Sequence, residues 1–428
     1  MAPDVDDPNN QSVQLRINRG HILALPAILM MPLAMLAPKG LVVLFVVTAL
    51  AVLTWGCVFK KTLRWPPRFF WAPFAVFVAY AAMSSVWSPT PLVSFKSAVI
   101  LGLITFGGLL LVSFAKNIET AERTVLARAL IIGTVLTLVL FGVERFTDVS
   151  IWRWVRFLKT GVAIVPVPVN PMADYNTAMS VGSLYIWSAL LFWSGGRRMF
   201  AVAGAFLAIL IIFWSEAETP AIAVLLGVLT ALLFWRGRSV MRVAFAGSVI
   251  ALMVAAPLIP GLFPGPETIR SNMPFLSASA IQRIMIWKVA AKHIAEDPVA
   301  GLGMNTSRSL YGKETKFVLN LPPPESGGRA WTPNLEPIPL HPHNGIIQIW
   351  LELGGLGIAG LAWIIFTLVR ITGGCLGQPL IFGFYVSSLA TFSLSFGAWQ
   401  SWWVCTLWLT AVLLVSQIPP AKLPQPDG

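Results

Sequence analysis

The chain has 428 residues, of which 56% are hydrophobic and 11% are charged, and its formal net charge is +12. Because an average soluble domain has roughly 25% charged residues, this composition excludes a set of soluble domains. The positive charge would favour nucleic-acid binding in a soluble protein. Here most basic residues lie in short connections between apolar runs, where they orient membrane helices, and no nucleic-acid partner is expected.

Apolar runs long enough to cross about 30 Å of hydrocarbon as helices recur along the chain. The sequence therefore predicts an all-α polytopic membrane protein with about 12 transmembrane helices. The predicted spans cover residues 21–37, 40–58, 69–87, 97–115, 124–143, 176–193, 198–214, 219–235, 240–259, 344–369, 377–395 and 400–417.

The distribution of basic residues predicts the orientation of these spans. Lys60, Lys116 and Arg370 lie in connections on one side, whereas Lys39 and Lys96 are nearly all that the short connections on the other side contain. Because basic connections stay inside, both termini are expected in the cytoplasm. The predicted parts are a cytoplasmic tail at 1–20, nine spans over 21–259, a large periplasmic loop at 260–343, three spans over 344–417 and a cytoplasmic tail at 418–428.

Two outer segments carry features of their own. Basic residues and aromatic side chains such as Trp152 and Trp154 interleave within residues 144–175, which is typical of a short helix at the membrane interface. In the large loop, residues 279–296 predict a helix that ends at Asp297-Pro298. Arg283 lies in an apolar stripe of this helix, so it either binds an anion or acceptor cluster or reaches the lipid headgroups.

The tenth span begins with a polar stripe. Asn344, Gln348 and Glu352 recur at a spacing of four and share one side of a helix. A carboxylate at that depth faces a bundle interior or a wet cavity. Glu352 therefore serves either to accept hydrogen bonds from neighbouring helices or to act in the chemistry of a site, and both interpretations stay open.

Two of the four histidines, His341 and His343, directly precede this span. An imidazole at the water interface is mostly neutral at neutral pH and can act as a general base, while Pro342 and Asn344 would fix its direction. The alternative is that the segment merely caps a membrane helix. No metal is expected, because neither Cys ligands nor an HExxH spacing accompanies the pair.

At these residues the chain resembles the O-antigen ligase superfamily of membrane glycosyltransferases. The family motif is a His-Asn pair, nine residues, Gly, two residues and Gly, which occurs here as His343-Asn344 with Gly354 and Gly357. A second similar stretch carries Arg283 and leads to a Pro-x-x-Gly-x-Gly turn at 298–303.

The resemblance implies transfer of a glycan from undecaprenyl diphosphate to an acceptor hydroxyl at the periplasmic face of the bacterial inner membrane, by a metal-independent enzyme of the GT-C type. His343 would be the base and Arg283 would bind the donor diphosphate. The supporting residues would be His341, Asn344, Gln348 and Glu352. The partners would be the lipid-linked donor, membrane lipids and either lipid A core or a growing polysaccharide, and no cofactor is implied.

One stretch departs from the family. Many members have a Ser-Arg-Gly type sequence after the seventh span, whereas this chain reads Ser215-Glu216-Ala217-Glu218-Thr219-Pro220 and has no arginine there. Either Arg270, Arg329 or another loop cation takes that place, or the donor is held differently.

Three functions remain open at this point. The first is O-antigen ligation to lipid A core, and the second is polymerisation of an O-antigen or exopolysaccharide by the same chemistry. The third is a transporter or flippase for lipid-linked sugars, because intramembrane polar residues are also a transporter trait.

Overall fold

The computed structural model describes most of the chain. The described residues are 18–59, 65–161, 175–194, 206, 209, 210, 212, 217–236, 239–310, 317, 318, 334, 335, 337–373 and 378–418. The predicted span at 198–214 lies largely outside them, and Arg329 lies outside them altogether.

The described elements are almost all helices. In the first half they are α1 (Arg19–Leu36), α2 (Gly40–Val58), α3 (Arg68–Met83), η1 (Ser84–Val86), α4 (Pro91–Lys116), α5 (Thr120–Phe146), α6 (Ser150–Thr160) and α7 (Asn176–Ser194). They continue with α9 (Glu218–Leu233), η3 (Phe234–Arg236), α10 (Ser239–Ala255), η4 (Ile259–Leu262), α11 (Pro266–Asn272), α12 (Ala278–Glu296) and η5 (Ser307–Leu310). The last are α13 (Gly345–Ile371), α14 (Gln378–Leu394) and α15 (Ser401–Ser416).

The all-α polytopic fold is confirmed. Among the described residues, 7 helical segments are long and apolar enough to span a membrane: α1, α2, α4, α5, α13, α3 with η1, and α9 with η3. The helices α10, α14 and α15 are apolar but shorter. The number of twelve spans therefore stays a prediction. A small departure from an all-helical chain is an antiparallel pair of two-residue strands, β1 (Phe317–Val318) and β2 (Asn334–Leu335).

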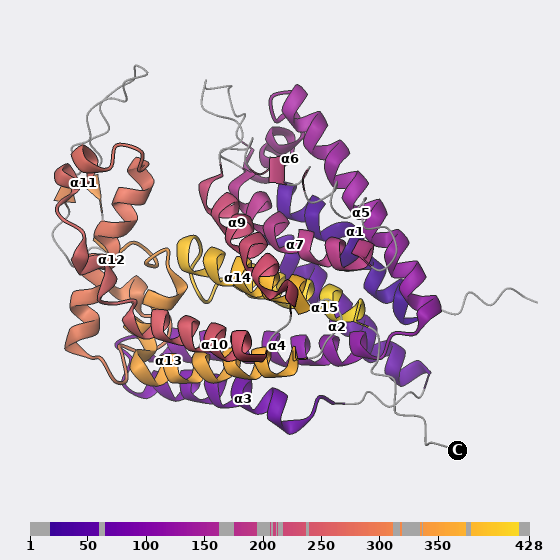
Figure 1. Cartoon of the computed structure of the whole chain (residues 1–428), viewed down its shortest axis with the longest axis horizontal. Coiled ribbons are helices and arrows are strands. Elements are labelled where there is room, and N and C mark those ends of the chain that lie inside the picture. Colours follow the sequence, from indigo (N-terminus) through magenta and orange to yellow (C-terminus); the bar gives the residue numbers. More distant parts are fainter. Residues whose placement is uncertain are drawn as a thin grey trace, which may run out of the picture.

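The helices form two groups that meet along the middle of the molecule. In Figure 1, α1, α5, α6, α7 and α9 lie in one part, while α3, α10 and α13 run side by side along the opposite edge. Helix α14 packs most extensively on α9, and α15 packs on α4. Helices α11 and α12 stand at one end, where α12 contacts α13 (Figure 1).

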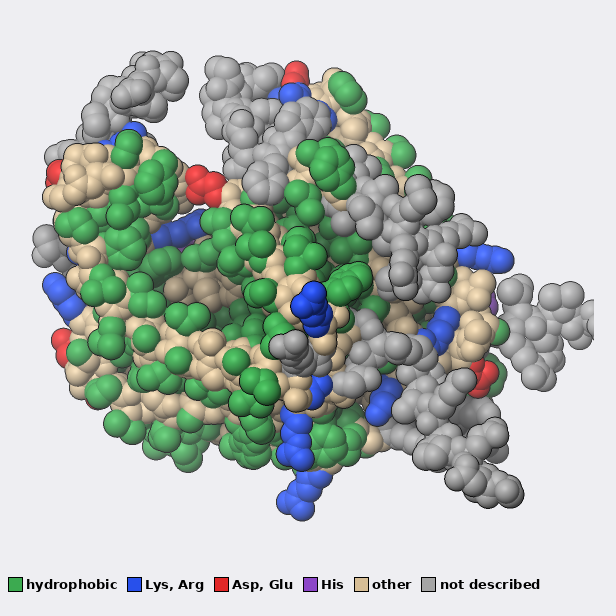
Figure 2. All heavy atoms as spheres, viewed as in Figure 1, with side chains coloured by type: hydrophobic (Ala, Val, Ile, Leu, Met, Phe, Trp, Pro, Cys, Tyr) green, Lys and Arg blue, Asp and Glu red, His purple; other side chains and the backbone are tan. Residues whose placement is uncertain are grey.

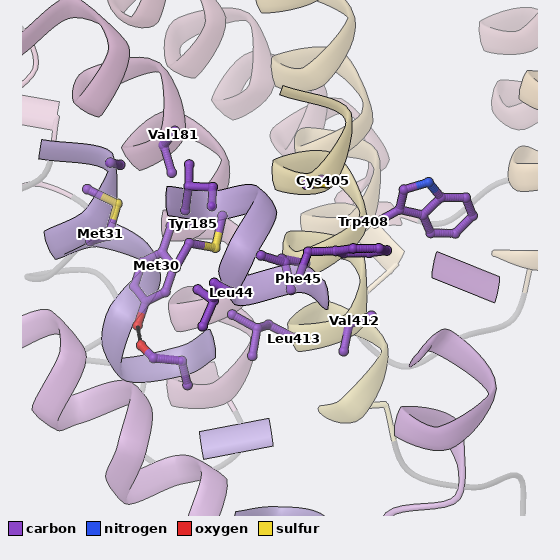
Figure 3. Packing of buried hydrophobic residues seen from close by; sticks show 14 of the residues in the cluster. Met30, Met31, Leu44, Phe45, Val181, Tyr185, Cys405, Trp408, Val412 and Leu413 are labelled. Atoms are coloured by element: carbon purple, nitrogen blue, oxygen red, sulfur yellow. Dashed lines mark hydrogen bonds between the residues drawn. The ribbon is translucent and has the colours of Figure 1, made fainter. Parts of the chain in front are cut away.

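Apolar side chains fill the space between α1, α2, α7 and α15. Figure 3 shows Met30, Phe45, Tyr185, Cys405 and Trp408 packed in this cluster, and Cys405 is fully buried. Small residues permit the close approach of helices, since a Cβ on Gly108 of α4 would lie 2.0 Å from the Trp408 ring. Close packing of this kind is what holds helices together in lipid, where burial of apolar surface drives little association.

Much of the outer surface is apolar. Hydrophobic side chains cover much of the face seen in Figure 2, and exposed examples include Val240 on α10, Leu103 on α4 and Leu232 on α9. A soluble protein rarely exposes continuous apolar surface of this extent. The surface and the lengths of the helices together describe a multi-pass membrane protein.

Candidate functional site: histidines and an arginine at the end of helix α14

The two histidines lie between β2 and the start of α13. Asn344 is the N-cap of α13, and its Oδ1 accepts hydrogen bonds from the backbone N–H groups of Ile346 and Ile347, both at 3.0 Å. Such a cap satisfies amide groups that have no partner within the helix. The sequence-based prediction that Asn344 caps this helix is confirmed, and the cap fixes the direction in which the histidine segment enters α13.

His343 has a backbone conformation that is rare for a side chain of its size. Its φ is 55°, in the left-handed region. Its backbone N–H donates to Nδ1 of His341 at 3.2 Å, and the two ring centroids are 4.3 Å apart. His341 therefore holds the strained backbone of its neighbour, and Gln400 holds His341 in turn through a 3.0 Å contact with its Nε2.

The ring of His343 is fixed in one tautomer. Its Nδ1 lies 3.1 Å from the backbone carbonyl oxygen of Ser395. Because a carbonyl oxygen can only accept, Nδ1 must carry the proton, and the neutral ring then has an unprotonated Nε2. Burial lowers the pKa of His343, the bond to Ser395 acts in the opposite direction, and the charge of Arg283 lowers the pKa further. His343 is therefore neutral at neutral pH, with a free nitrogen lone pair.

Arg283 comes to the same place from the loop. Its Nη1 donates to the backbone carbonyl of Leu394 at 2.7 Å and lies 3.5 Å from Oγ1 of Thr219. Leu394 is the last residue of α14, and its carbonyl is one of the acceptors that a helix end leaves without a partner. Of the two alternatives for Arg283, the structure shows the acceptor cluster: the side chain points to the end of α14.

The loop helix α12 is tied directly to the histidine segment. The indole Nε1 of Trp287 donates to the backbone carbonyl of Pro342 at 2.9 Å. Viewed as in Figure 1, the molecule in Figure 2 is hollowed between the surface over α11 and α12 and the surface over α9 and α14, and basic and acidic side chains reach this hollow. The loop helix thus folds back over the histidines, as the pairing of Arg283 with His343 requires.

Glu352 lies at the centre of a buried hydrogen-bond network. Its Oε1 accepts from Ser307 N at 3.2 Å, from Ser307 Oγ and from Gln348 Nε2 at 3.0 Å, and its Oε2 accepts from Asn305 N and Trp399 Nε1. Gln348 also accepts from the backbone N–H of Ala398 at 2.8 Å. Because Glu352 is 0% exposed and both oxygens are occupied, its role in the structure is to hold neighbouring segments together.

A break in α13 joins the two sequence stretches that resemble the family motifs. Gly354 has φ 60° and ψ −162°, which is not helical. The turn at 297–303 uses the groups that the break frees, with bonds from Leu302 N to Leu351 O at 3.0 Å and from Gly355 N to Pro298 O at 2.8 Å. A Cβ on Gly354 would lie 2.3 Å from the oxygen of Val299. Glycine is therefore required at this position both by conformation and by space.

The structure places one of the two cations predicted as substitutes for the missing arginine, so that substitution stays a prediction. Arg270 donates to the backbone carbonyl of Leu276 at 3.1 Å, within its own loop. Arg329 lies outside the described residues. In the stretch that departs from the family, Glu218 lies near Arg283. The Oε2 atom of Glu218 accepts a hydrogen bond from Ser277 Oγ at 3.1 Å.

Several residues of the site could not be found from the sequence. Ser395 and Gln400 carry no motif, and Ser395 acts through its backbone. Arg308, whose charge acts on His341, has no distinguishing pattern either.

The comparisons with known proteins cover the part of the chain that carries this site. A family model described as "O-Antigen ligase" matches residues 203–362, a range that contains Arg283, His343 and Glu352. A protein of Rickettsia typhi is 23% identical over 353 residues, covering 79% of this chain and 78% of the relative. A protein of Rickettsia bellii is 25% identical over 350 residues, with the same coverage of 79% and 78%. Both carry the name "Putative polysaccharide ligase".

The fold and the site define a multi-pass membrane protein with an arginine and a histidine gathered at the end of one helix. The family match over residues 203–362 and the relatives show that the chain is similar to the O-antigen ligase superfamily. The activity of this class is of the polysaccharide ligase type, that of a glycosyltransferase-like enzyme.

Proposed function

We propose that the chain transfers a glycan from undecaprenyl diphosphate to a hydroxyl of lipid A core, at the periplasmic face of the bacterial inner membrane. The proposal rests on one observation. Arg283 and His343 donate hydrogen bonds to two successive backbone carbonyls, those of Leu394 and Ser395. A cation and a neutral imidazole held side by side suit a reaction that removes a proton and releases an anion.

His343 would act on the acceptor. Its Nε2 takes the proton of the acceptor hydroxyl while that oxygen attacks the anomeric carbon of the donor sugar. A positioned general base contributes typically 10² to 10⁴ in rate. His341 accepts from the backbone N–H of His343, and Asn344 caps α13, so both would fix the backbone from which the ring extends.

Arg283 would act on the donor. As the bond between the anomeric carbon and the diphosphate oxygen breaks, the diphosphate leaves with the electron pair, and the guanidinium neutralises the charge that develops on it. The donor is already activated by its diphosphate, so the mechanism is proposed to be metal-independent, as in enzymes of the GT-C type, and to need no cofactor. If the site faces the periplasm, as proposed, the segment from η4 to the start of α13 is periplasmic and both termini are cytoplasmic.

The decisive test uses purified protein with lipid-linked donor and core acceptor. We expect product from the wild type and loss of product from His343→Ala and Arg283→Ala, with both variants still eluting as folded protein. Sustained transfer by His343→Ala would remove it as the base. Absence of transfer by the wild type, together with movement of the donor across a vesicle bilayer, would favour a flippase.

A deletion strain separates ligation from polymerisation. Loss of a ligase leaves long glycan on the lipid carrier and bare core, which is the expected result because the relatives are named as ligases. Core that carries a single repeat unit would show a polymerase instead. Unchanged lipopolysaccharide with a missing secreted polysaccharide would also exclude the ligase.

A further inference from the structure

Among the residues that the structure describes, Arg308 is a cation beside the candidate site for which no partner is found. It lies in η5 and is exposed. In the part of the chain that the structure describes, no hydrogen bond or ion pair engages its guanidinium. Because a guanidinium offers five donors in a rigid fork, an unengaged one can take the oxygens of an anion in pairs.

The backbone beneath Arg308 is held firmly. The neighbouring Ser307 binds Oε1 of the buried Glu352 through both its N–H and its hydroxyl. Thr306 adds a bond from Oγ1 to the carbonyl of Gly303, and Ser309 N donates to Thr306 O at 2.7 Å. An exposed arginine is usually mobile along its whole length, but here a network of buried polar groups fixes its base.

The same network leads to the histidines. Trp399 donates to Oε2 of Glu352, and the next residue, Gln400, contacts Nε2 of His341. At the other end of η5, Leu310 packs in a cluster with Ile338 and Ile347, which bracket the histidine segment in the sequence. Arg308 is thus carried on a short helix that packs against both ends of that segment.

The charges of the two arginines reach the two rings from different elements. The charge of Arg308 acts on His341, and that of Arg283 acts on His343, in both cases favouring the neutral imidazole. Two other cations of the described loop donate to nearby carbonyls: Arg270 to Leu276 O, and Lys288 to the carbonyls of Phe263 and Pro264. Arg283 itself is engaged with Leu394 and Thr219.

We propose that Arg308 is a second anion-binding residue, which takes phosphate oxygens of the lipid-linked donor together with Arg283, and that Glu352 is the positioning residue that holds it. The inference rests on the proposed function for the identity of the anion. Under this proposal the buried carboxylate of Glu352 positions a cation at the site and does not itself contact the substrate.

The experiment measures donor KM and kcat for Arg308→Gln and Arg308→Lys, with Lys292→Gln as the control. Lys292 is an exposed cation on α12 that stands outside the site. Loss of a charge-assisted hydrogen bond to phosphate is expected to raise the donor KM about tenfold or more with Arg308→Gln. We expect a smaller change in kcat, partial recovery with Arg308→Lys, and no change with the control.

A binding measurement keeps this inference separate from the proposed function. Purified protein in nanodiscs is titrated with undecaprenyl diphosphate and with undecaprenyl monophosphate, neither of which requires turnover. Arg308→Gln is expected to weaken binding of the diphosphate more than of the monophosphate. If the wild type binds the diphosphate but transfers nothing, while Arg308→Gln binds it more weakly than Lys292→Gln does, the proposed function fails and the role of Arg308 stands. Equal binding by Arg308→Gln and Lys292→Gln overturns the role of Arg308.

The positioning role of Glu352 is tested through Ser307→Ala, which removes one donor and spares the buried carboxylate. We expect donor KM to rise by a few-fold while kcat and the thermal unfolding midpoint stay close to the wild type. A fall in kcat and in the unfolding midpoint without a change in KM would show a structural role only.

Discussion

Arg283 and His343 donate hydrogen bonds to successive backbone carbonyls, those of Leu394 and Ser395, at 2.7 Å and 3.1 Å. The end of α14 thereby acts as a template that sets the two side chains at a fixed separation. Carbonyls at a helix end carry partial negative charge and attract cations and N–H donors. Neither residue depends on the other for its placement, so each can be replaced without moving its neighbour.

Substitution of His343 separates its chemistry from its structural contacts. His343→Gln retains a side chain that can donate to the Ser395 carbonyl but cannot take a proton. We expect the single-turnover rate of glycan transfer to fall by about 10² to 10⁴, with donor KM nearly unchanged. Size-exclusion elution and the thermal unfolding midpoint check the fold. A loss of rate under fivefold would contradict the assignment of the base.

The pH dependence of stability reports on His341. Burial, followed by the charges of His343 and Arg308, lowers its pKa from 6.5 to about 4. Between these values the unfolded chain binds a proton that the folded chain does not, so the free energy of unfolding falls as the pH falls from 6.5 toward 4. Above pH 6.5 this group contributes no pH dependence.

The matched variant for this prediction is His341→Asn, whose amide oxygen can accept from the backbone N–H of His343 but does not titrate. Unfolding midpoints measured from pH 7.5 to pH 5 are expected to fall less steeply for the variant than for the wild type. Identical slopes would show that the proton-linked loss arises elsewhere.

Glu218 is expected to oppose donor binding. Its carboxylate acts on Arg283, where an incoming diphosphate would bring further negative charge. Glu218→Gln keeps the acceptor for Ser277 and removes the charge, so donor KM is expected to fall about two- to fivefold. Measurements at low and high salt provide the check, because the gain should shrink as salt screens the charge. A rise in KM would indicate that Glu218 binds the substrate.

The break in α13 is expected to tolerate no side chain. In Gly354→Ala the new Cβ meets the Val299 oxygen at 2.3 Å, and the residue must keep a φ of 60°. The strain and the clash should lower the stability by about 1–3 kcal/mol or more and detach the turn at 297–303. Gly247→Ala is the control, since nothing lies within 4 Å of its Cβ. Limited proteolysis of the turn and the unfolding midpoint measure both effects.

The local features of the site could be predicted from the sequence. The cap at Asn344 and the stripe through Gln348 and Glu352 follow from helical spacing, and the loop helix that carries Arg283 follows from its apolar pattern and the Asp297-Pro298 stop. These features depend on neighbours in the sequence, where the geometry of a helix decides which side chains meet.

The remaining features depend on segments that are distant in the sequence. The acceptor for His343 is the backbone carbonyl of Ser395. Every residue type has such a carbonyl, so the sequence does not indicate which one accepts the bond. The sequence leaves open whether Glu352 is structural or catalytic. Its hydrogen-bond donors include Ser307 and Trp399, which are distant from it in the sequence, so spacing along α13 does not identify them. Arg308 acquires its position only through that network, so its sequence neighbourhood did not mark it.

The broken helix α13 also bears on how the chain is assembled. In a bilayer, a helix interior with free amide and carbonyl groups is costly. The groups freed at Gly354 are satisfied by the turn at 297–303, which is synthesised before α13. We therefore expect stable integration of this span to depend on docking of the preceding segment, so that a defect in that segment acts as a defect of the span.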